Sequence, residues 1–233
     1  HREAMLWSVE LPTAVWATPR TLRAPPDGPT HVVIADMQGR VMLIEGTTGR
    51  ELWRRELGCP LPKAPLLADW DRDGRLEIIV TSCDDLVVLS SDGEIVETFS
   101  GLGNAHSRPV MVDDGGNGQA SLLVGTTDAR AVAMSADGTE SWSRSLSRHE
   151  AASVSSPVVL ADPDRDGHPE AFFTTTDGRL TVIDVATGEE LWHFDMPGGE
   201  TIEATVVSYD VDGDGREEIV VAGHNRRIFC LRF

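Results

Sequence analysis

The chain has 233 residues, and its 38 acidic and 20 basic side chains give a formal net charge of −18. This negative excess argues against nucleic acid and anionic membranes as partners. No apolar run reaches the roughly 20 residues that a membrane-spanning helix needs, so we expect no membrane insertion. Three cysteines are an odd number without the spacing of metal ligands, and they imply no disulfide framework.

A short segment with an apolar run recurs along the chain. It is clearest at residues 64–69 and 156–162, and weaker copies begin at positions 18, 108 and 204. The equivalent positions 19, 65, 109, 157 and 205 lie 44 to 48 residues apart, which indicates five units of nearly constant length.

Each unit contains short runs of Val, Ile, Leu and Thr that are bounded by Asp, Gly and Pro, a pattern typical of β-strands. The second run of each unit is expected at 31–35, 77–81, 121–125, 170–174 and 218–222. The third run is expected at 41–44, 86–89, 131–134, 180–183 and 227–231. No window shows a helical stripe. Four strands in about 40–50 residues predict an all-β fold, a β-propeller of four-stranded blades.

We expect one domain of five blades, in which strands from both ends of the chain form the fifth blade. The fifth unit stops after its third strand, and residues 5–11 match residues 190–196 in phase, so the N-terminal strand would complete the last blade. A fragment of a larger ring, cut at both ends, is the alternative. The predicted blades span approximately 12–57, 58–102, 103–147, 148–196 and 197–233 plus 1–11.

Residues 177–192 carry an Asp-Gly turn, a Thr-Gly turn and a Leu-Trp ending, and residues 46–53 repeat that ending. This pattern resembles the repeat of quinoprotein-like (PQQ-like) propellers. The resemblance implies a structural role between blades for the equivalent residues Trp7, Trp53, Trp142 and Trp192. We expect no PQQ, because the enzymes that use it resemble eight-bladed rings with a vicinal cysteine pair, which this chain lacks.

Three loops between the first and second strands share the pattern Asp-x-Asp-x-Asp-Gly-x-x-Glu. Each loop crowds four carboxylates into nine residues, and Ca²⁺, which takes oxygen ligands, would neutralise them. The loops resemble those of FG-GAP/VCBS propellers, as found in integrin α-subunit heads, and predict up to three structural Ca²⁺ ions. The residue after the Gly would supply only its carbonyl. The predicted ligands are Asp69, Asp71, Asp73, Arg75 and Glu77; Asp162, Asp164, Asp166, His168 and Glu170; and Asp210, Asp212, Asp214, Arg216 and Glu218.

The other two blades have lost this motif. Residues 113–118 lack acids at the third and ninth positions of the pattern, and residues 23–28 carry a single acid. We therefore expect no metal at either loop.

A ligand would bind at the face that carries the blade connections and the turns between second and third strands. An exposed Trp16 would suit a sugar, whereas a Trp16 that faces the core would not. Candidate ligand-binding residues in the connections are Trp16, Lys63, His106, Arg108, His149 and Glu203. The turns add Asp36, Gln38, Asp84, Asp85, Asp128, Asp177, His224, Asn225 and Arg226.

These features predict a non-catalytic, calcium-stabilised propeller that binds a glycan or protein, as a monomer or as a domain of a larger protein. An assembly scaffold, as in PQQ-like propellers that support outer-membrane machinery, is one form of this hypothesis. Loops of this kind fill at about millimolar calcium, which favours an extracellular, periplasmic or cell-surface location. The alternative is the propeller domain of a polysaccharide lyase or hydrolase, with Asp84, Asp85 and Glu203 as candidate acids and bases.

Overall fold

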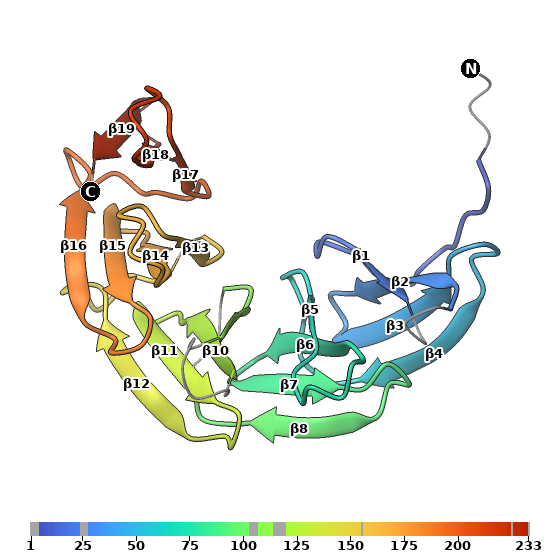
Figure 1. Cartoon of the computed structure of the whole chain (residues 1–233). Helices are drawn as coiled ribbons and strands as arrows, with labels where there is room; N and C mark the ends of the chain where they lie inside the picture. The colour runs from blue at the N-terminus through green and yellow to red at the C-terminus, as the bar shows by residue number, and fades with distance from the viewer. Residues whose placement is uncertain are drawn as a thin grey trace. The chain divides into compact units, whose positions relative to one another are not determined.

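The computed structural model describes residues 5–23, 28–102, 107–113, 120–154, 156–224 and 226–232. Within these ranges the chain forms β-strands and no helix (Figure 1). None of the described segments is therefore a helix that could cross a membrane. The predicted all-β class and the four-stranded antiparallel repeat are confirmed.

The first compact unit, His1–Leu102, contains two four-stranded antiparallel sheets whose strands follow chain order. The first sheet consists of β1 (Arg20–Arg23), β2 (Thr30–Ala35), β3 (Arg40–Glu45) and β4 (Glu51–Glu56). The second consists of β5 (Leu66–Ala68), β6 (Glu77–Ser82), β7 (Asp85–Leu89) and β8 (Ile95–Phe99).

The second compact unit, Gly103–Phe233, begins where the sequence predicts the third blade, and it contains three sheets in its described part. The first is β9 (Val110–Asp113), β10 (Ala120–Gly125), β11 (Arg130–Ser135) and β12 (Glu140–Ser145). The next is β13 (Val159–Ala161), β14 (Glu170–Thr174), β15 (Arg179–Asp184) and β16 (Glu190–Asp195). The last is β17 (Val207–Tyr209), β18 (Glu218–Ala222) and β19 (Ile228–Arg232).

The strands lie where the apolar runs predict them. The bounds of β14 and β18 coincide with the predicted runs 170–174 and 218–222. The fifth sheet has three strands among the described residues, and residues 5–11 form none, so closure of this blade by the N-terminal segment stays a prediction.

In the first four sheets the second and third strands are largely buried because neighbouring sheets within a unit pack against each other, whereas β19 of the fifth sheet is largely exposed. In the first unit Val33 and Leu43 of one sheet join Ile78 and Val80 of the next in one apolar cluster. In the second unit one cluster joins the third and fourth sheets, and another joins the fourth and fifth. The fourth strands are more exposed; for example, alternate residues of β16 are open to solvent.

Tryptophans on fourth strands hold neighbouring sheets together, as the resemblance implied. The indole Nε1 of Trp53 donates a 2.9 Å hydrogen bond to the carbonyl of Ser91, and that of Trp142 donates one of 2.9 Å to Val185. Each ring covers a glycine of the next sheet so closely that a Cβ there would clash; a Cβ on Gly93 would lie 2.6 Å from the Trp53 ring. Trp7 contacts the first sheet in the same way, through the carbonyl of Gly46 at 2.8 Å.

The absence of a disulfide framework was a wrong prediction. Cys59, in the connection between β4 and β5, is bonded to Cys83, in the turn between β6 and β7. Their separation of 24 residues resembles no metal motif, so spacing alone gave no signal for the bond. Two strand connections meet at this point of the fold, and this proximity pairs the two cysteines. Cys230 is free and exposed.

Candidate metal sites and a neighbouring pocket

The three acidic loops adopt the same backbone turn, in which each Asp side chain caps amides farther along the loop. In the loop 162–170, Asp162 accepts from the amide of Gly167 at 3.0 Å, and Asp166 accepts from the amide of His168 at 2.8 Å. Gly167 has a φ of 91°, in the left-handed region that favours glycine. Gly74 and Gly215 have φ values of 86° and 93° at the same place, so the shared motif encodes a shared conformation.

The turn brings carboxylate oxygens together in each loop. In each of three groups, one oxygen per residue lies within 4.8 Å of the others: Asp69, Asp71 and Glu77; Asp162, Asp164 and Asp166; and Asp210, Asp212 and Glu218. Nine of the predicted carboxylate ligands are thus gathered in threes. Asp73, Glu170 and Asp214 lie outside these groups. The residues after the glycine, Arg75, His168 and Arg216, are exposed, and their role as carbonyl ligands stays a prediction.

Where a carboxylate is buried among other acids, its ionised form is disfavoured. Burial, followed by the charges of Asp164, Asp162 and Asp166, raises the pKa of Glu170 to about 7. One oxygen of Glu170 and one of Asp69 are buried and make no hydrogen bond in the described structure. A hard cation with six to eight oxygen ligands would satisfy such atoms, and the donor set therefore fits Ca²⁺.

In the loop 210–218 a guanidinium group lies among the acids. The Nη2 atom of Arg232, at the end of β19, is 2.6 Å from Asp212, 2.8 Å from Glu218 and 3.2 Å from Asp214. These contacts raise the pKa of Arg232, with the hydrogen bond to Glu218 as the main cause. Sequence reasoning missed this residue, although the strand register sets Arg232 directly opposite Glu218.

The predicted ligand-binding residues have diverse surroundings. Trp16 is 70% exposed, which is the first of the two alternatives that the sequence left open, and its role in binding a sugar stays a prediction. Lys63 is half-buried, and burial lowers its pKa. Glu203 is exposed and pairs with His224 at 3.1 Å, which brings together two residues of the predicted face. Arg108 is half-buried, and His106 lies outside the described residues.

Two turn residues of the predicted face are structural. Asp36 is fully buried and accepts a 2.7 Å hydrogen bond from the Nε of Arg40, so it is not available to a ligand. Asp177 accepts hydrogen bonds from the hydroxyls of Thr175 and Ser147 and so organises the turn before β15. Asp84 and Asp85 border the turn after β6, beside the bonded Cys83.

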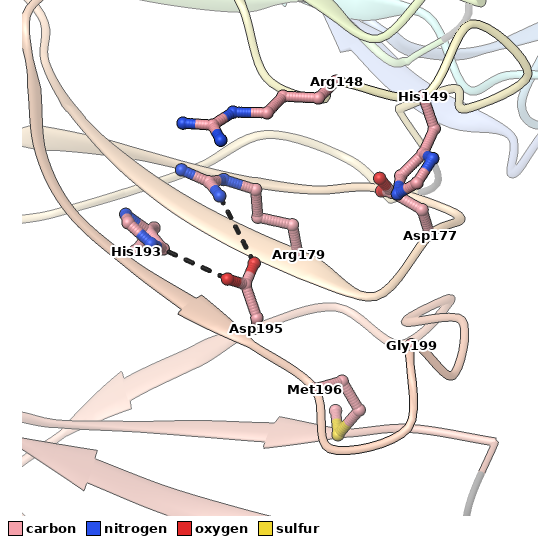
Figure 2. Close-up of a pocket in the computed structure, with 8 residues that line it drawn as sticks. All are labelled: Arg148, His149, Asp177, Arg179, His193, Asp195, Met196 and Gly199. Atoms are coloured by element: carbon pink, nitrogen blue, oxygen red, sulfur yellow. Dashed lines mark hydrogen bonds and ion pairs between the residues drawn. The ribbon is translucent and has the colours of Figure 1, made fainter.

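A pocket of about 400 Å³ opens in the second unit, where the connection after β12 meets β15, β16 and the segment after β16 (Figure 2). Arg179 is the central side chain and is paired with Glu190 at 3.0 Å and Asp195 at 3.4 Å. His149 and Asp177 were expected on the ligand face, whereas the other lining residues were not singled out from sequence. The lining residues are Arg148, His149, Asp177, Arg179, His193, Asp195, Met196 and Gly199.

Comparison with known families identifies the family to which these repeats belong. The family described as outer membrane protein assembly factor BamB matches residues 3–232, which is nearly the whole chain. The chain belongs to this family. The predicted PQQ-like repeats are therefore confirmed, and the sheets of the chain correspond to repeats of the β-propeller type. No curated protein sequence matches the chain.

Solved structures show the same propeller fold at low sequence identity. BamB from Moraxella catarrhalis is 15% identical with a TM-score of 0.65, and the match covers 95% of this chain and 62% of that one. The Vibrio cholerae biofilm matrix protein Bap1 is 21% identical with a TM-score of 0.66, covering 89% and 35%. Quinohemoprotein alcohol dehydrogenase from Comamonas testosteroni is 14% identical with a TM-score of 0.67, covering 94% and 41%. The chain thus spans less than two thirds of each of these proteins.

Proposed function

We propose that this chain is a non-catalytic propeller module, stabilised by calcium, that binds a protein or glycan partner outside the cytosol. The observation that supports the calcium part is that carboxylate oxygens converge in three loops whose sequence resembles the calcium loops of FG-GAP/VCBS propellers. Buried oxygens of Asp69 and Glu170 without hydrogen-bond donors add support. A structural ion at each loop would fix the connection between the first and second strands of its blade.

The extracytoplasmic location has support from three features. The Cys59–Cys83 disulfide is a bond that persists in oxidising compartments and is rare in the cytosol. Calcium loops of extracellular type bind at about 10⁻⁴–10⁻³ M, a range that suits calcium levels outside the cytosol. The family is named for an outer membrane protein assembly factor, and a periplasmic or surface role for this chain agrees with that name.

The binding role has support from the fold and the family. The family name describes an assembly factor, and one similar structure is titled a biofilm matrix protein. The sheets of each unit are joined by connections at their ends, and propellers generally bind at such loops. A scaffold of this kind needs no catalytic residues of its own.

Calcium titration of dialysed, chelator-treated protein tests the proposal. We expect two or three Ca²⁺ ions per chain by equilibrium dialysis and a higher melting temperature with Ca²⁺, with little effect of Mg²⁺ at the same concentration. Binding of no more than one ion per chain, or a melting temperature that does not respond to Ca²⁺, would show that the loops are not structural calcium sites.

A further inference from the structure

The pocket beside Arg179 contains two arginines whose N–H groups are not all paired within the described residues. Arg148 is exposed and forms no hydrogen bond or ion pair with any part of the chain that the structure describes. The Nε of Arg179 is buried and has no hydrogen-bond partner in the described residues, although its terminal nitrogens pair with Glu190 and Asp195. In Figure 2 both guanidinium groups extend in the same direction from the pocket wall. The net charge of −18 opposes the binding of anions by the chain as a whole, so a site for an anionic group depends on local guanidinium donors of this kind.

The acids of the pocket are already engaged. Asp177 accepts hydrogen bonds from Thr175 and Ser147, and Asp195 contacts Arg179 at 3.4 Å and His193 at 3.7 Å. These carboxylates hold the turn and orient the cationic side chains. The donors left for a ligand are therefore the guanidinium of Arg148, the imidazole of His149 and, on each terminal nitrogen of Arg179, the second N–H group; the Arg179 Nε is buried and does not reach the pocket.

The lining favours a small polar anion over an apolar ligand. Among the described lining residues Met196 is the only large apolar side chain, and none is Phe, Tyr or Trp. A volume of about 400 Å³ lies within the usual range of small-ligand sites, about 300–1,000 Å³. Guanidinium groups bind carboxylates through paired, charge-assisted hydrogen bonds. At the rim, aspartate side chains would accept hydrogen bonds from hydroxyl groups of a ligand. Histidine side chains would donate to such hydroxyl groups or accept from them.

We propose that this pocket binds a hexuronate residue of an acidic polysaccharide, with the sugar carboxylate between Arg148 and Arg179 and its hydroxyls toward His149 and Asp195. A hexuronate combines the carboxylate and the hydroxyl groups for which the lining provides partners. The proposal rests on the proposed function, because it names the class of glycan that the propeller recognises and the place where it binds.

The test is a titration of the whole chain with a galacturonate trisaccharide, monitored by NMR, with a galactose trisaccharide as the neutral probe. We expect the acidic probe to bind at least about tenfold more tightly, because each charge-assisted hydrogen bond adds affinity. Arg148→Gln should lower affinity for the acidic probe about tenfold and leave the neutral probe unaffected. Arg54→Gln, a half-exposed arginine on β4 outside the pocket, is the matched control and should change nothing.

Three results would overturn the proposal: equal affinity for both probes, no binding of the acidic probe, or an Arg148→Gln variant that binds as wild type does. A pentaglutamate peptide that competes fully for the pocket would favour an acidic peptide instead. Calcium stoichiometry measured on the same samples separates this test from the proposed function. Normal calcium binding without uronate binding rejects only the pocket, whereas the opposite pattern rejects only the calcium loops.

Discussion

The loops 162–170 and 210–218 contain the same acids at the same positions but differ in how their charge is balanced. In the fifth sheet Arg232 reaches three acids of the loop, with Nη2 at 2.6 Å from Asp212. In the fourth sheet the residue opposite Glu170 in the strand register is Asp184, so no cation occupies the equivalent position. Two loops with the same acids can thus differ in how much of their negative charge is left for a bound metal ion to neutralise.

The loop 69–77 of the second blade has a third kind of support. It lies within the segment that the Cys59–Cys83 disulfide closes. Trp70, inside the loop, is buried and donates its backbone amide to Glu77 at 2.8 Å and its indole Nε1 to Glu97 at 3.1 Å. A covalent bond or a guanidinium group can each restrain such a loop; the disulfide encloses the loop 69–77, and Arg232 contacts the acids of the loop 210–218.

Removing the disulfide should have the largest effect on this comparison. A Cys59→Ala/Cys83→Ala double variant frees a closed segment of 24 residues, for which chain entropy predicts a loss of about 3–4 kcal/mol in the free energy of unfolding. Calcium-free denaturant unfolding measures it. Reductant should destabilise wild type and leave the double variant unchanged. An unaltered free energy of unfolding would mean that packing alone fixes the loop.

Removing the first acid of a loop should have the next largest effect. Asp162→Asn retains the shape of the side chain but removes charge, and we expect it to lose one Ca²⁺ per chain. A site occupied at 100 times its Kd contributes about 2.7 kcal/mol, so most of that calcium-dependent stabilisation should disappear. Asp210→Asn should lose less, because Arg232 already offsets part of the charge in its loop. Thermal melts with and without Ca²⁺ measure both variants. Equal losses would contradict the difference between the loops.

The repeat pattern made most of the fold predictable. The hydrophobic runs predicted β14 and β18 at their observed bounds, since strands buried on both faces read as continuous apolar segments. The tryptophan positions followed from the same repeat, and the indole–carbonyl bonds of Trp53 and Trp142 confirm their place between sheets. These features are local or periodic, so a single sequence is enough to find them.

Contacts between different elements of the fold were not predictable in the same way. The bond between Cys59 and Cys83 depends on how two strand connections meet, and the sequence spacing of the two cysteines does not predict it. Arg148 and Arg179 line one pocket although 31 positions separate them (179 − 148). Asp36 was expected at a ligand face and is instead buried against Arg40, because a turn acid can serve its own hairpin.

Replacing Arg232 gives the smallest expected effect and the most direct test of the comparison. Arg232→Gln removes the guanidinium that contacts Asp212, Asp214 and Glu218, so Ca²⁺ no longer competes with an internal cation at this loop. We expect affinity for Ca²⁺ there to rise about tenfold, equivalent to about 1.4 kcal/mol. Isothermal titration calorimetry on a chain whose other two loops carry Asp69→Asn and Asp162→Asn isolates the site.

Arg216→Gln is the matched control, because it removes an exposed positive charge from the same loop for which the structure shows no ion pair with the loop acids. It should strengthen calcium binding much less than Arg232→Gln does. Equal gains from the two variants would mean that Arg232 acts only through the general field of the protein, since a charge at Arg216 lies at the same loop. A gain confined to Arg232→Gln would instead assign the effect to the direct contacts of Arg232. The negative charge of the loop 210–218 would then be partly neutralised by the protein itself.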